Sequence, residues 1–110
     1  MKERIKCETV KDTLYIHIYG EIDHHSAREI RTEIDTKLYE ARPCELILDL
    51  SSVEFMDSSG LGLILGRYTK ASEIGAKFKL LNPTDAVAKI LVMSGTDKLI
   101  KIERTKSNEQ

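Results

Sequence analysis

Polar and less polar residues alternate in two stretches near the start of the chain, residues 5–9 and 14–18. A period of two is typical of β-strands that bury one face. The short polar segment Lys11-Asp12-Thr13 separates the stretches, which favours a tight turn between them. We therefore expect a β-hairpin, with Gly20 ending its second strand.

A helical pattern follows the hairpin. Asp23 or Ser26 can cap the start of this helix by accepting from its free amides, and Glu29 stands three residues after Ser26, the spacing of a capping box. Pro43 cannot continue a helix, so we expect the helix to end before it. The apolar stripe that would face the core consists of Ala27, Ile30, Ile34, Leu38 and Ala41.

The middle of the chain predicts a strand, a loop and a second helix. Residues 46–50 are apolar except for Asp49, a pattern typical of a central strand covered on both faces. We expect a loop from Ser51 to Gly60 and a helix that begins near Ser58 and ends at Ile74-Gly75. The apolar positions of this helix are Leu61, Ile64, Leu65 and Tyr68.

The last third of the chain predicts a strand, a helix and a further strand. Residues 78–81 form the first strand, Asn82-Pro83-Thr84-Asp85 is a typical helix start, and Gly95 ends the helix. Residues 99–102 suggest a short last strand. The polar residues 104–110 have no periodicity, and we expect them to fray.

Together these elements predict one α/β domain over residues 1–110. Strand–helix–strand units make right-handed crossovers between parallel strands, so we expect a mixed, mostly parallel sheet with an N-terminal hairpin and helices packed on it. A chain of 110 residues is too short for two cores. Its composition, 41% hydrophobic and 32% charged, is that of a folded protein.

The net charge excludes several classes of partner. The chain carries 17 basic and 18 acidic side chains, a net charge of −1, so no overall field draws it to nucleic acid or to an anionic membrane. Cys7 and Cys44 are too few for a disulfide framework, and no apolar run approaches the ~20 residues that span a membrane. We expect a cytoplasmic protein with buried or inert thiols and with proteins as partners.

Hydroxyl and glycine residues gather where the second helix starts. Loops at the carboxyl ends of parallel strands are the usual binding sites of open α/β sheets. Here Asp57, Ser58 and Ser59 offer three capping side chains where one is enough, while Gly60 and Gly62 lower the helix propensity of the first turns. A simple helix cap explains one of these residues. The excess favours a surface whose backbone a partner approaches closely.

Three segments in order resemble a known family. The central run is Phe55-Met56-Asp57-Ser58-Ser59-Gly60-Leu61-Gly62-Leu63-Ile64-Leu65-Gly66-Arg67-Tyr68. It is preceded by Gly20-Glu21-Ile22-Asp23-His24-His25 and followed by Met93-Ser94-Gly95. These segments closely resemble the sporulation anti-anti-sigma factors of the STAS family, of the sigma F type. The resemblance covers nearly the whole chain.

The resemblance implies a STAS fold and the role of an anti-sigma factor antagonist, which is not an enzyme. The unphosphorylated form would bind an anti-sigma factor that is also a serine kinase, and so release the sigma factor for transcription. The kinase would phosphorylate the serine directly after the aspartate, here Ser58, and a serine phosphatase would reverse the modification. The partner-binding residues that the resemblance and the loop together suggest are Asp23, Asp57, Ser58, Ser59, Gly60 and Gly62.

A serine hydrolase is one alternative use of the same loop. Ser58 or Ser59 would be its nucleophile and His24 or His25 its base, because His17 lies in the middle of a predicted strand. The loop lacks the glycine two residues before the serine that a nucleophile elbow carries.

A nucleotide-binding module is the other alternative. Gly60, Gly62 and Gly66 depart by one residue from the dinucleotide-binding spacing, and no Walker lysine follows. For Gly62 and Gly66 we favour close packing of the helix on the sheet. We expect no cofactor, with weak nucleotide binding left open, and no metal site at His24-His25, since no further ligand stands at a suitable spacing.

Overall fold

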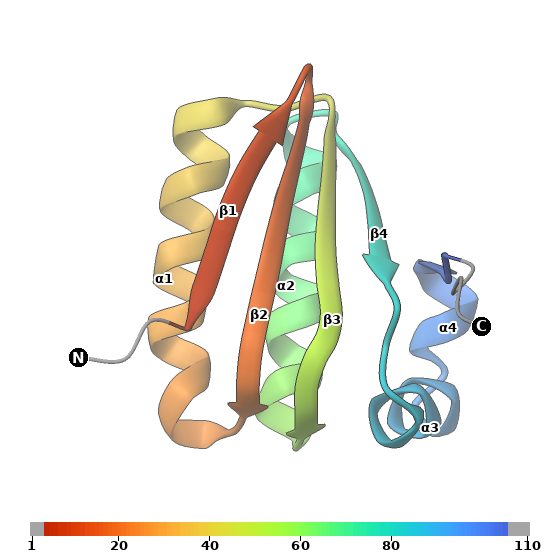
Figure 1. Cartoon of the computed structure of the whole chain (residues 1–110). Helices are drawn as coiled ribbons and strands as arrows, with labels where there is room; N and C mark the ends of the chain where they lie inside the picture. Colours follow the sequence, from red (N-terminus) through yellow and green to blue (C-terminus); the bar gives the residue numbers. More distant parts are fainter. Residues whose placement is uncertain (1–3, 106–110) are drawn as a thin grey trace.

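A mixed sheet of five strands is the centre of the computed structural model, which describes residues 4–105 (Figure 1). The strands lie side by side in sequence order; β1 and β2 pair antiparallel and all other neighbours pair parallel. The strands are β1 (Ile5–Val10), β2 (Thr13–Ile22), β3 (Glu45–Met56), β4 (Lys77–Leu81) and β5 (Lys101–Glu103). The helices are α1 (His24–Ala41), α2 (Ser58–Glu73), α3 (Asp85–Met93) and α4 (Thr96–Leu99). The predicted mixed, mostly parallel sheet with an N-terminal hairpin is confirmed.

The sheet has one face covered by α1 and α2 and one open face (Figure 1). Leu14, Ile16 and Ile18 of β2 are almost completely buried and belong to the core cluster that includes Ile30 and Ile34 of α1. Burying one such side chain stabilises a fold by about 1.5–3 kcal/mol, so this face holds much of the folding free energy. The residues that alternate with them in β2 are only half-buried, because no helix covers their side of the strand.

The expectation that the central strand is covered on both faces is wrong. Leu48 and its even-numbered neighbours in β3 belong to the core beneath the helices, whereas Asp49 is half-buried on the other face. Ile47 is buried but lies outside the main core cluster, between Tyr15 and Lys79 in the sheet register. Helices α3 and α4 lie beside β4 at the edge of the sheet (Figure 1).

β2 and β3 are longer than the sequence predicted. β2 continues through Gly20, and the two strands pair as far as Ile22 and Met56. Register shifts flank Gly20, whose φ of 82° glycine adopts without strain, so this residue forms an irregularity within the strand and not its end. As β3 extends through most of the predicted loop from Ser51 to Gly60, only Asp57 separates it from α2.

The start of α1 differs in one detail from the prediction. Asp23 is the N-cap and Ser26 completes its capping box, whereas Glu29 has no part in the cap. Glu29 instead forms an exposed ion pair with Arg4, 3.5 Å apart. The helix ends at Ala41, before Pro43, as the sequence predicted.

The C-terminal third contains a short helix where a strand was expected. Thr84 caps α3, and Gly95, with φ of 79°, follows its end as predicted. A single further turn, α4, then occupies residues 96–99, and Ile100 is buried before β5 begins. The predicted strand over residues 99–102 therefore starts at Lys101.

The chain is held in place through Thr105. Arg104 Nη1 donates to the Pro83 carbonyl at 3.2 Å, and the Thr105 amide donates to Asn82 Oδ1 at 2.9 Å. The Asn82 amide group donates in turn to Thr105 Oγ1 at 3.0 Å. The predicted fraying of residues 104–110 is thus wrong for the first two, because these hydrogen bonds fix them, and residues 106–110 lie outside the described part.

Candidate functional site

The two long helices begin side by side at one end of the sheet, next to the carboxyl ends of β2 and β3. β2 and β3 are parallel neighbours that end in register at Ile22 and Met56. The amide of Asp57 donates to the Ile22 carbonyl at 3.2 Å, which ties the two strand ends together. Asp23 and Asp57, the residues that follow the strands, are the N-caps of α1 and α2. Figure 1 shows α1 and α2 starting at the same end of the sheet, so the fold brings their N-caps, two of the predicted site residues, together there.

The cap of α2 leaves one serine hydroxyl unused. Asp57 Oδ1 accepts from the Ser59 amide at 2.8 Å, so the predicted cap belongs to the aspartate. Ser58 is the first residue of the helix and is exposed, and its hydroxyl forms no hydrogen bond with residues 4–105. Ser59 is half-buried. Of the two serines, Ser58 is thus the one that an approaching molecule reaches.

Asp23 supplies a fixed negative charge at the same end of the sheet. Its Oδ1 accepts from the amides of His25 and Ser26, both at 2.9 Å. The Ser26 hydroxyl accepts from the Asp23 amide at 3.0 Å and donates to the Glu21 carbonyl at 2.9 Å. Hydrogen bonds from Ser26, its backbone amide first, and from the His25 amide lower the pKa of the Asp23 carboxyl, which stays ionised at neutral pH.

The glycines of α2 have different surroundings. Gly60 is buried, and a β-carbon there would lie 2.6 Å from the Met56 Cβ, so contact within the fold explains this glycine. A β-carbon at Gly62 or Gly66 would meet nothing within 4 Å. The predicted close packing of these two glycines on the sheet is therefore wrong, because the space beside them is open. All three lie inside a helix and not in a loop, and weak nucleotide binding stays a prediction.

Neither predicted base reaches the predicted nucleophiles. His24 and His25 are exposed at the start of α1, with ring centroids 5.6 Å apart, and neither side chain hydrogen-bonds to Ser58 or Ser59 in the structure of residues 4–105. Within the same residues, no group of three or more His, Cys, Asp and Glu side chains could hold a metal ion.

The two thiols are accessible. Cys7 on β1 and Cys44 before β3 are both exposed, so of the two predicted alternatives a buried thiol is wrong and an inert thiol stays a prediction. Cys7 lies in β1 at the edge of the sheet, where every residue after Ile5 is exposed. The described chain contains no helix that is long and apolar enough to cross a membrane.

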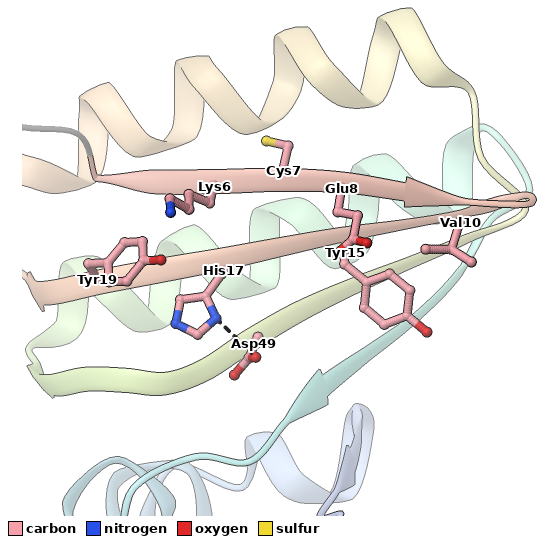
Figure 2. Close-up of a pocket in the computed structure, with 8 residues that line it drawn as sticks. All are labelled: Lys6, Cys7, Glu8, Val10, Tyr15, His17, Tyr19 and Asp49. Carbon is pink, nitrogen blue, oxygen red and sulfur yellow. Dashed lines mark hydrogen bonds and ion pairs between the residues drawn. The ribbon is translucent and has the colours of Figure 1, made fainter.

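A polar cluster on the open face escaped the sequence prediction. His17 Nδ1 lies 3.0 Å from Asp49 Oδ2, and His17 Nε2 lies 2.9 Å from Ser52 Oγ. Figure 2 shows this imidazole between Tyr15 and Tyr19, in a shallow pocket that β1 borders. The cluster joins β2 to β3 next to the register shift after His17, where the ladder is irregular. Asp49 and Ser52 are 32 and 35 residues away from His17 in the sequence, so no local motif predicts the cluster.

Comparison with known proteins identifies relatives along nearly the whole chain. Residues 4–109 match the STAS domain family. The chain is 36% identical over 103 residues to the anti-sigma F factor antagonist of Paenibacillus polymyxa. This alignment covers 93% of this chain and 87% of the relative.

Solved structures agree with this assignment. The structure of the anti-sigma factor antagonist SpoIIAA in its unphosphorylated form is similar with a TM-score of 0.79 and 32% identity, over 96% of this chain and 90% of the other. The phosphorylated form of the Bacillus cell fate determinant SpoIIAA gives a TM-score of 0.72 and 30% identity, over 96% and 94% of the two chains. This chain therefore belongs to the STAS domain family.

Proposed function

We propose that this chain is an anti-sigma factor antagonist that phosphorylation of Ser58 switches off. The observation that carries the proposal is the Ser58 hydroxyl at the start of α2, directly after the capping Asp57; it is exposed and forms no hydrogen bond to any residue from 4 to 105. Relatives of at least 30% identity carry the name of anti-sigma factor antagonist. In its unphosphorylated form the chain binds the anti-sigma factor, and the sigma factor is released.

The geometry allows a phosphate at Ser58 without damage to the fold. A phosphoserine carries about −1.5 to −2 charges at pH 7. The first turn of a helix has free amides and a partial positive charge that accommodate an anion. Because Ser58 points to solvent, no core side chain has to move.

The same phosphate would weaken partner binding. It adds to the carboxylates of Asp57 and Asp23, which already stand at this end of the sheet. Like charges brought together across an interface cost several kcal/mol. Since about 1.4 kcal/mol corresponds to a tenfold change in affinity, phosphorylation would weaken binding about a hundredfold or more.

The partners follow from this role. We propose that the anti-sigma factor is also the serine kinase that modifies Ser58, and that a serine phosphatase restores the active form. The relatives that control sigma F favour a sigma factor of that type and a role in sporulation, in the cytoplasm. A solved relative in both phosphorylation states supports regulation by phosphate.

The role is that of a regulatory binding protein and not of an enzyme. The relatives give no support to a serine hydrolase, and within residues 4–105 the exposed His24 and His25 form no hydrogen bond to Ser58 or Ser59. Binding at the helix starts requires neither a base nor a cofactor.

Mass spectrometry tests the site assignment. The chain is incubated with the anti-sigma F factor of the same bacterium and ATP, and the phosphorylated peptide is sequenced. We expect one phosphate on Ser58 and none on a Ser58→Ala variant. Ser59→Ala serves as the matched control and should be modified like the wild type. Phosphate on Ser59, or no phosphate on the wild type, would contradict the proposal.

A further inference from the structure

A basic groove of about 670 Å³ lies between α1 and α2. Its lining includes Ser59, the neighbour of Ser58, so the groove reaches the end of the sheet where the proposed switch lies. The side chains and backbone that matter for its chemistry are those of Arg28, Arg31, Arg67, Gly62 and Gly66. We call this feature the α1–α2 groove.

Arg67 gives the groove a buried positive charge. Its side chain is only 5% exposed, and its Nε lies 2.8 Å from Asp35 Oδ1, in ionic contact though not aligned for a hydrogen bond. Burial lowers the pKa of Arg67, Asp35 opposes this effect, and the nearby charge of Arg31 lowers the pKa further. Arg67 thus has one carboxylate and one further guanidinium group near it, which leaves a surplus of positive charge.

Arg28 and Arg31 are the accessible cations of the groove. Both are exposed on α1, three residues apart and so on neighbouring positions of one helix face. Neither forms an ion pair within residues 4–105. A guanidinium group binds a carboxylate through two parallel hydrogen bonds, so these side chains suit acidic residues.

Gly62 and Gly66 leave two positions without a side chain on the α2 wall of the groove, which Ser59, Leu63 and Arg67 also line. They stand one helical turn apart, and each lowers the helix propensity of α2. Because the space next to both is open, no contact within the fold requires them to be glycine. At these two positions the backbone of another protein chain can approach α2 closely.

We infer that the α1–α2 groove binds an acidic segment of the anti-sigma factor. The inference rests on the proposed function and names the chemistry of its partner. The backbone of the segment would lie over Gly62 and Gly66, and its carboxylates would pair with Arg28 and Arg31. A groove of this size holds several side chains and not a single ion. A phosphate on Ser58 would place negative charge at one end of the groove and repel the same segment.

Charge reversal in the groove tests this inference. Binding of the purified anti-sigma F factor of the same bacterium is measured by calorimetry for the wild type, for Arg28→Glu/Arg31→Glu and for Lys89→Glu/Lys98→Glu. The control pair is exposed on α3 and α4 and changes the net charge by the same amount. We expect at least a hundredfold loss of affinity for the groove variant and less than a threefold loss for the control. Equal affinities for the two variants would overturn the inference.

A second measurement locates the contact without charge reversal. Gly62→Ala/Gly66→Ala should bind at least tenfold more weakly than the wild type although its melting temperature is not lowered. In ¹⁵N spectra of the wild type, the amides of Arg28, Arg31, Gly62 and Gly66 should shift when the anti-sigma F factor is added. Shifts confined to the open face around His17, or an unchanged affinity of the alanine variant, would overturn the inference.

The two failures are distinguishable. A wild type that does not bind the anti-sigma F factor contradicts the proposed function, and the inference falls with it. A wild type that binds, together with a groove variant that binds as tightly as the control variant, contradicts the groove alone.

Discussion

Gly60 packs directly against Met56, so closely that a β-carbon at position 60 would lie 2.6 Å from the Met56 Cβ. This contact fixes the first turn of α2 on the end of β3, and with it the position of Ser58. Glycines 60 and 62 are two residues apart in one helix, yet only the first is required by packing.

The first prediction compares alanine at these two glycines. Gly60→Ala should lower the free energy of unfolding by about 1–3 kcal/mol, because the added methyl group displaces Met56 or the helix. Gly62→Ala should raise it by about 0.5–1 kcal/mol, because alanine has the higher helix propensity and meets open space. Urea unfolding of both variants measures the difference. The reverse order of stabilities would contradict this account of α2.

A second prediction concerns the cap of α1. Asp23→Ala should lower the free energy of unfolding by about 1 kcal/mol, because the amides of His25 and Ser26 lose their acceptor. Asp23→Asn should lower the free energy of unfolding by less, since asparagine is also a good N-cap. Urea unfolding at neutral pH compares the two variants, and an Asp23→Ala variant as stable as the wild type would count against the cap.

The stabilisation by Asp23 should also depend on pH. The pKa of its carboxyl is lowered from 3.8 in the folded chain, so its charge stabilises the fold above that value. The contribution is lost as the pH falls through the folded pKa. The stability gap between the wild type and Asp23→Asn should therefore shrink as the pH falls below 3.8 and through the lower pKa of the folded state. A gap that widens on acidification would contradict the assignment.

The open face provides a third prediction. His17 and Asp49 are joined at 3.0 Å, with side chains 29% and 22% exposed, so their contact is partly shielded from water. A double-mutant cycle of His17→Ala and Asp49→Ala should give a coupling energy of about 0.5–1.5 kcal/mol. His24→Ala, at an exposed position, is the control and should change stability by less than about 0.5 kcal/mol. Additive effects at positions 17 and 49 would show that the pair contributes nothing.

The periodicity of the sequence was sufficient to predict the five strands and the three longer helices in their order, but not the short helix α4. The alternation in β2, the stripe of α1 and the breaks at Pro43 and Gly95 all predicted elements that the structure contains. The length of β2 was not predictable, because Gly20 is a typical strand end and only its pairing with β3 makes it part of the strand. The cover of β3 was also not predictable, since an apolar run does not reveal that one face lies open.

The candidate site was predictable only where it is local. Asp57, Ser58 and Ser59 are consecutive, so their cluster is visible in the sequence. The α1–α2 groove combines Arg31 with Arg67, which come from two helices separated in the sequence by β3. Only the folded structure shows that these two residues lie close together, and the same holds for the cluster around His17.

A fourth prediction concerns variants of the switch residue. Ser58→Ala should unfold like the wild type and bind the anti-sigma F factor with similar affinity, because the hydroxyl forms no bond within the described fold. Ser58→Asp should stay folded and bind about tenfold or more weakly, as its single charge imitates part of the phosphate. Ser59→Asp is the positional control. Equal binding by Ser58→Asp and Ser58→Ala would contradict a charge switch at this residue.

The most direct test of the account compares two forms of the same chain. The affinity for the anti-sigma F factor is measured by calorimetry for the unphosphorylated chain and for the chain phosphorylated stoichiometrically at Ser58. We predict tight binding by the first form and binding weaker by about a hundredfold or more by the second. Tight binding by the fully phosphorylated chain would contradict the central claim.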